Sequence, residues 1–90
     1  MLDNIKLALR IKNTAYDLEI TDLLEACEAD LKRVGIKEEK INSDDALIKR
    51  LKVIYCKMNF GYDNSDFERL KVVYNDLRNS ISLCKEYTDV

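Results

Sequence analysis

The chain has 90 residues and a formal net charge of −2 at pH 7, which predicts a single domain and argues against a globally basic nucleic-acid-binding protein. No apolar run is long enough to span a bilayer, and the first ten residues lack the apolar core and the cleavage site of a signal peptide. We therefore expect a cytoplasmic protein with no membrane partner.

The composition favours an all-α fold. Hydrophobic residues make up 47% of the chain and charged residues 36%, which is typical of a chain that folds around a core. Proline is absent and glycine occurs only twice, so the usual turn-forming residues are scarce. We expect residues 1–90 to form one small four-helix domain with a short first helix.

The first two predicted helices cover residues 2–11 and 15–34. Thr14 is a candidate N-cap for the second helix, with Asp17 three residues later in a capping-box position. Gly35 can take the left-handed conformation that ends a helix. The apolar residues of the second helix recur at steps of three and four: Tyr16, Ile20, Leu23, Leu24, Cys27, Leu31 and Val34.

Residues 36–43 are charged and lack a clean period, so they are expected to form an exposed linker. The third predicted helix covers residues 44–60, with Ser43 as its candidate N-cap. Its apolar residues again follow a helical period: Leu47, Ile48, Leu51, Ile54, Tyr55 and Met58.

The stretch "NFGYDN", residues 59–64, is interpreted as a tight turn between helices, with Gly61 just past the end of the third helix. The fourth predicted helix covers residues 65–84, capped by Asn64 or Ser65. Its heptad-like stripe suits an antiparallel hairpin with the third helix. The tail, residues 85–90, has no period and is expected to fray.

The sequence offers no site for catalysis, a metal or another cofactor. It has no histidine, and two distant glycines cannot form a phosphate-binding loop. Cys27, Cys56 and Cys84 are widely spaced and fall on the apolar faces of predicted helices, so all three are expected to be buried thiols. We therefore do not expect an enzyme.

The placement of charge is distinctive. The second predicted helix is acidic, and the third, past its first turn, carries only cations. One interpretation is two solvated faces that follow the helix dipoles; another is complementary surfaces between subunits, or a cationic face toward phosphates. The candidate interface or DNA-channel residues are Lys49, Arg50, Lys52, Lys57, Glu19, Asp22, Glu25 and Glu28. Apolar residues off the main stripes favour an oligomer: Leu7, Ile11, Val53, Val72 and Leu83.

Four segments resemble the small phage head–tail connector proteins, also described as DNA-packaging or head-completion proteins: "IKLALRI", "EITDLLEACEADLKRVGI", "LIKRLKVIYCKMNFGYDN" and "FERLKVVYNDL". The resemblance runs from about residue 3 to residue 84. The residues that carry it most clearly are Leu7, Leu9, Arg10, Ile11, Asn59, Phe60, Gly61, Tyr62, Asp63 and Asn64. At Ser65 the chain departs from relatives that often place proline there.

The resemblance implies a non-enzymatic virion assembly protein of a phage or prophage. It implies a ring of copies on the portal protein that continues the DNA channel and receives the next connector or tail-completion protein. The expected partners are therefore further copies, the portal, that next protein and passing double-stranded DNA bound without sequence specificity. The expected locations are the bacterial cytoplasm during assembly and the head–tail junction of the virion.

Two alternatives remain at this point. A small helical DNA-binding regulator would place the third predicted helix in the major groove, which its cations suit and its apolar residues do not. A protein-binding adaptor or inhibitor of a host enzyme would recognise a partner other than the portal.

Overall fold

The computed structural model describes residues 2–60 and 65–88, and in these residues the fold is all-α, as predicted. Within them the chain forms five helices rather than the expected four. They are α1 Leu2–Leu9, α2 Asp17–Arg33, α3 Glu38–Ile41, α4 Ala46–Asn59 and α5 Phe67–Ser82. The additional helix, α3, lies in the stretch that was expected to be an exposed linker.

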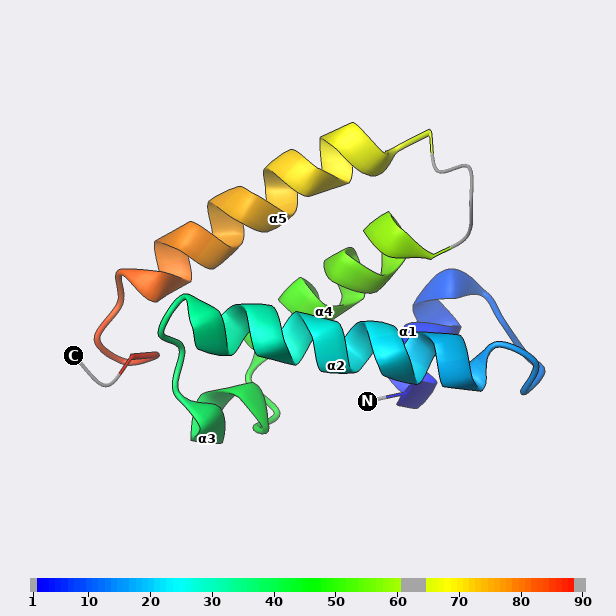
Figure 1. Ribbon diagram of the computed structural model, residues 1–90, viewed down its shortest axis with the longest axis horizontal. Helices are drawn as coiled ribbons and strands as arrows, with labels where there is room; N and C mark the ends of the chain where they lie inside the picture. The colour runs from blue at the N-terminus through cyan, green and yellow to red at the C-terminus, as the bar shows by residue number, and fades with distance from the viewer. Residues whose placement is uncertain (1, 61–64, 89–90) are drawn as a thin grey trace.

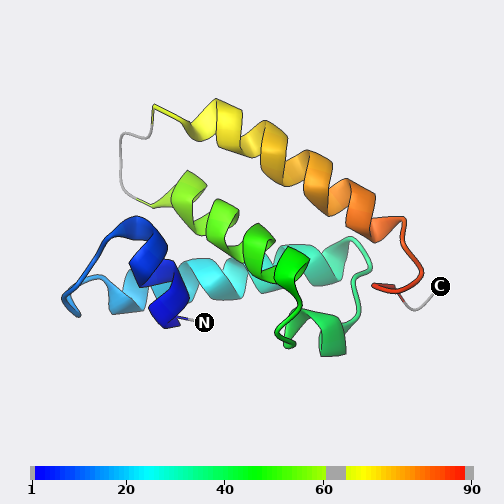
Figure 2. The ribbon, with the colours of Figure 1, turned by 180° about the vertical axis from the view of Figure 1, so that it is seen from behind.

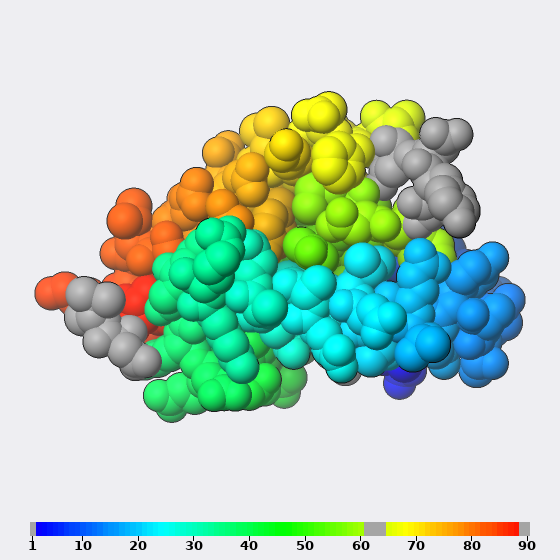
Figure 3. Space-filling view, in the orientation of Figure 1, coloured from blue at the N-terminus to red at the C-terminus, as the bar shows by residue number. Residues whose placement is uncertain are grey.

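The helix α4 is the centre of the molecule, since it packs against α1, α2 and α5. Figure 1 shows α2 in front of α4, with α5 above them and running in the opposite direction to α4. Seen from behind, α4 lies in front of α2 (Figure 2). The molecule measures 40 × 25 × 19 Å, so α2 and the far side of α4 lie on its two broad faces. In the space-filling view α2 forms a band along one of these faces (Figure 3).

Two hydrophobic clusters hold the helices together, and α4 contributes to both. The larger cluster joins α2, α4, α5 and the C-terminal segment around Leu31, Leu51 and Tyr74. The smaller cluster joins α1 to α2 and α4 around Ile5, Ile20 and Cys56. Each buried aliphatic side chain contributes about 1.5–3 kcal/mol relative to exposure, so the three-sided burial of α4 is a main source of stability.

The predicted end of α2 is confirmed. Gly35 has a φ of 97°, and the hydrogen bonds are those of a Schellman motif: Ile36 N donates to Leu31 O at 3.1 Å and Gly35 N donates to Lys32 O at 3.0 Å. Leu31 and Ile36 are both buried in the larger cluster, so the expected apolar contact accompanies the motif. Glycine is needed here because the left-handed region is unfavourable for other residues.

The predicted helix starts were wrong. Tyr16, not Thr14, is the N-cap residue of α2, and no side chain caps it. Asp45 rather than Ser43 caps α4, since its Oδ1 accepts from Leu47 N at 3.0 Å and Ile48 N at 3.2 Å. Asp66 rather than Ser65 occupies the N-cap position of α5. Several capping residues stand close together at each start, and tertiary packing decides which of them is used.

The end of α1 also differs from the prediction. The helix ends at Leu9 instead of residue 11, and Arg10 takes a φ of 60°. Ile11 N donates to Lys6 O at 2.9 Å across this turn. The chain is thereby turned so that Ile11 packs, half-buried, against the smaller cluster.

The sequence predicts an exposed linker at residues 36–43 and a frayed tail at residues 85–90. The structure corrects both predictions as far as residue 88, because each segment contributes buried side chains. Ile36, Ile41 and Tyr87 are buried in the larger cluster, and Thr88 beside Tyr87 is also buried. Ile36 and Thr88 form an antiparallel bridge, and Lys37 N donates to Tyr87 O at 2.8 Å. The two segments show no helical period because they cover the core as irregular chain and, in α3, as a helix of only four residues, which is too short for periodicity to reveal.

Two further sequence predictions concern the hairpin and the cysteines. Gly61 and the remainder of the predicted turn through Asn64 lie outside the described residues. Cys27 and Cys56 are buried as expected, but Cys84 is exposed because α5 ends at Ser82, before the stripe reaches it.

None of the described helices is long and apolar enough to cross a membrane.

Candidate functional site

A groove with a volume of about 800 Å³ runs between α4 and α5, with Asn4 of α1 at its edge. We call it the cationic groove. Its charged lining residues are Lys49, Arg50 and Lys57 from α4, Arg69 from α5, and the single acid Asp66. Its apolar lining residues are Ala46, Val53, Ile54, Leu70 and Val73. The groove therefore combines an apolar floor with mostly positive edges, which suits a partner that is both apolar and acidic.

Helical spacing places these residues together. Ala46, Arg50, Val53 and Lys57 follow one another at steps of four, three and four, so they share one side of α4. On this side of α4, Arg50 and Lys57 are exposed, whereas Val53 is half-buried and packs against the smaller cluster. Arg69 and Val73 are four residues apart on α5 and form the opposite wall.

Two of the cations already have acidic neighbours within the chain. Lys49 Nζ lies 3.8 Å from Asp44 Oδ1, and Arg69 Nη2 lies 3.5 Å from Asp66 Oδ2. These ion pairs are solvent-exposed and contribute little to stability, about 0–1 kcal/mol each. Both cations therefore remain available to an incoming acidic group.

The structure separates Lys52 from the other predicted interface cations. Lys52 is only 5% exposed; its Nζ donates to Ile41 O at 2.7 Å and lies 3.3 Å from Glu28 Oε2. The ammonium group joins α4 to α2 and satisfies the last carbonyl of α3. The prediction that Lys52 belongs to an exposed interface was wrong. Glu28, another predicted interface residue, is the acid that pairs with Lys52 within the chain.

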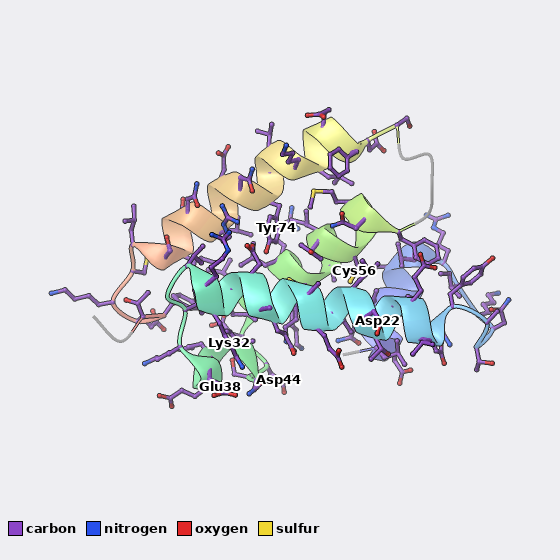
Figure 4. The ribbon with its side chains drawn as sticks, viewed as in Figure 1. Asp22, Lys32, Glu38, Asp44, Cys56 and Tyr74 are labelled. Carbon is purple, nitrogen blue, oxygen red and sulfur yellow. The ribbon has the colours of Figure 1, made fainter. Side chains whose placement is uncertain are left out.

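The remaining predicted acids lie on the other broad face of the molecule. Glu19, Asp22 and Glu25 are exposed on α2 and form no ion pair within residues 2–60 and 65–88. Figure 4 shows Asp22 on α2, on the side nearest the viewer. Apart from the Lys52–Glu28 pair, the structure therefore does not bring the predicted acidic and basic residues together within the chain.

A second polar centre, around Asp30, joins α2 to α5. Its Oδ2 accepts from the Tyr74 hydroxyl at 2.7 Å and from Arg78 Nη1 at 2.9 Å, and Arg33 Nη2 donates to Oδ1 at 2.7 Å. Burial favours a higher pKa for Asp30, but these three donors outweigh it and hold the pKa below its usual value. Figure 4 shows Tyr74 pointing from α5 into the space between the helices. This centre is structural, since every polar group in it has a partner.

A third polar contact holds the C-terminal segment. The Tyr87 hydroxyl donates to Asp45 Oδ2 at 2.9 Å, and Lys40 Nζ lies 5.1 Å from the centre of the Tyr87 ring. Burial raises the pKa of Tyr87 to about 12, and the hydrogen bond to Asp45 acts in the same direction. Asp45 therefore caps α4 and anchors the segment that follows α5.

The residues that carry the family resemblance have structural positions where they are described. Leu9, Ile11 and Phe60 pack against the smaller cluster. Asn59 Nδ2 donates to Tyr55 O at 2.9 Å, and Leu7 is 80% exposed. Gly61, Tyr62, Asp63 and Asn64 lie outside the described residues. In the described parts of the chain, no group of three His, Cys, Asp or Glu side chains is placed to hold a metal ion.

Sequence reasoning missed the groove's α5 wall. This wall consists of Arg69, Leu70 and Val73, which meet α4 only after the two helices have packed. From the sequence, Leu70 belongs to the apolar stripe of the fourth predicted helix, which is expected to face the core. The available signal was the run of charged and apolar residues at 66–73, which is compatible with either a surface or a groove.

The comparison with protein families identifies the chain. The family model described as "Phage connector protein" matches residues 1–88. The chain therefore belongs to the phage connector protein family, a family of structural assembly proteins associated with the portal and other head–tail components. No curated protein and no solved structure matches the chain.

Proposed function

We propose that this protein is a head–tail connector that forms a ring on the portal vertex and continues the DNA channel toward the tail. In this function it has no chemistry of its own. It acts as a single domain, assembles in the bacterial cytoplasm and remains at the head–tail junction of the virion. The observation that carries the proposal is the family match over residues 1–88.

The arrangement of surfaces supports a ring. A cyclic ring with more than two members uses a heterologous contact, in which each subunit offers two different surfaces. The described residues offer two surfaces of opposite charge: the cationic groove of α4 and α5, and the acidic side of α2. They lie on different faces of the molecule, so both are accessible to neighbouring copies at the same time (Figures 1 and 2).

DNA within the channel of this ring is bound without sequence specificity. Phosphate contacts from Lys and Arg are independent of sequence and weaken steeply with salt. A sequence-specific regulator is less well supported, because α4 buries Ile48, Leu51 and Ile54 against its neighbours and exposes few side chains that could read bases.

The proposed function is tested by interrupting the gene in the phage that encodes the chain and supplying the protein from a plasmid. Without the protein we expect heads that lack tails or lose their DNA, and with it normal virions, as seen by electron microscopy. Mixing the purified protein with the portal of the same phage should give a ring coaxial with the portal. Infectious, tailed virions formed without the protein would contradict the proposal.

A further inference from the structure

The exposed side of α2 carries a regular stripe. Leu18, Asp22, Glu25 and Ala29 follow one another at steps of four, three and four, and all four are exposed. Leu18, in the first turn of α2, is 75% exposed and so offers apolar surface to a partner. We call these four residues the α2 outer stripe. It is an acidic stripe with an apolar residue at its N-terminal end.

The cationic groove has the same spacing on α4. Ala46, Arg50, Val53 and Lys57 also follow at steps of four, three and four, so the two stripes have equal length and matching rise along their helices. The stripe supplies two acids and a leucine, and the groove supplies cations above an apolar floor. Charge and shape are therefore complementary between the two surfaces.

The stripe and the groove of one molecule cannot meet. Lys52 of α4 points to α2, where it pairs with Glu28, and Arg50 lies about 200° around the helix from Lys52. The groove therefore opens away from α2 of its own chain. If an α2 helix occupies the groove, it comes from another copy.

We propose that the cationic groove binds the α2 outer stripe of a second copy of this chain. Leu18 then lies on the apolar floor, and Asp22 and Glu25 face Arg50 and Lys57. The contact is heterologous and leaves one free groove and one free stripe at the two ends, so further copies can add until the rotation between neighbours closes a ring. The inference rests on the proposed function, because it identifies the contact between neighbouring subunits of the ring.

A second copy explains the groove better than nucleic acid does. A phosphate backbone offers no apolar group to cover the floor of Val53, Leu70 and Val73. The second copy supplies an exposed leucine as well as negative charge. DNA binding at the groove is retained as an outcome of the test.

The test is a charge exchange between the two surfaces. Variant A carries Arg50→Glu and Lys57→Glu, which makes the groove acidic; variant B carries Asp22→Lys and Glu25→Lys, which makes the stripe basic. Wild-type self-association is measured by sedimentation velocity at low salt. A and B alone should each associate at least about tenfold more weakly than wild type, because like charges then face each other.

Mixing A with B should restore association, since each acidic groove then meets a basic stripe. The variant that carries all four changes should self-associate like wild type, within about threefold. A matched control, Lys12→Glu with Lys85→Glu, changes the net charge as variant A does but at exposed residues outside the groove, and should behave as wild type. Circular dichroism confirms that every variant remains helical.

Three results would overturn the inference: a wild-type protein that remains monomeric at low salt, normal association of A or B alone, or no recovery in the mixture. Loss of DNA binding in A together with unchanged self-association would assign the groove to DNA instead.

If this inference fails while the protein still completes virions, the proposed function stands with another interface. If the charge exchange succeeds but virions form without the protein, the proposed function fails and the contact stands.

Discussion

Lys52 and Arg50 lie two residues apart on α4, and their side chains have opposite surroundings. Lys52 is buried between α2 and α3, where it hydrogen-bonds a carbonyl and pairs with Glu28. Arg50 is exposed in the cationic groove and forms no ion pair within the described residues. The inner face of α4 uses charge to hold one chain together, and the outer face presents charge to the solvent. A count of cations along a helix therefore does not measure the size of its interaction surface.

The largest expected effect comes from removing the inner cation. Lys52→Met should lower the free energy of unfolding by about 2–3 kcal/mol, because Ile41 O and Glu28 lose their buried partner. Arg50→Met, the same change on the outer face, should alter it by less than about 0.5 kcal/mol. Urea denaturation of both variants measures the difference. Equal effects would mean that the two faces of α4 do not differ in this way.

An intermediate effect is expected from acid. Although burial favours a higher pKa, hydrogen bonds from Tyr74, Arg33 and Arg78 hold the pKa of Asp30 below its usual value in the folded state. Its contribution to stability is therefore complete above the unfolded-state pKa and is lost as the pH falls through the folded-state pKa. The free energy of unfolding should therefore decrease as the pH falls below about 4.

The Asp30→Asn variant should lose about 1–2 kcal/mol at neutral pH and show a weaker dependence on acid, since it no longer accepts charge-assisted hydrogen bonds from Arg33 and Arg78. Asp22→Asn on the exposed side of α2 serves as the control and should change stability by less than about 0.5 kcal/mol. Thermal melts between pH 3 and pH 7 provide the measurement. An Asp30→Asn variant as stable as wild type at neutral pH would show that the Asp30 centre does not stabilise the fold.

The smallest effect concerns reactivity rather than stability. Burial raises the pKa of Cys27 to about 12 and that of Cys56 to about 11, whereas Cys84 is exposed. We expect one thiol to react quickly with a thiol reagent in the native protein and two to react only after unfolding. Cys84→Ser should abolish the fast reaction. Rapid native modification of Cys27 or Cys56 would contradict their place in the core.

The helical class, the approximate ranges of four helices and the Schellman end of α2 at Gly35 could all be predicted from the sequence. These follow from short-range physics: apolar residues at steps of three and four share a helix side, and glycine readily takes a left-handed turn. The family was also indicated by the sequence, through the resemblance of four segments rather than through such physics. The tertiary structure alone decided that Asp45 caps α4, that Tyr87 and Thr88 cover the core, that Lys52 is buried and that Arg69 joins the cationic groove. Each of these depends on contacts between residues distant in the chain, and the free energy of such contacts is determined by which segments pack together rather than by local sequence.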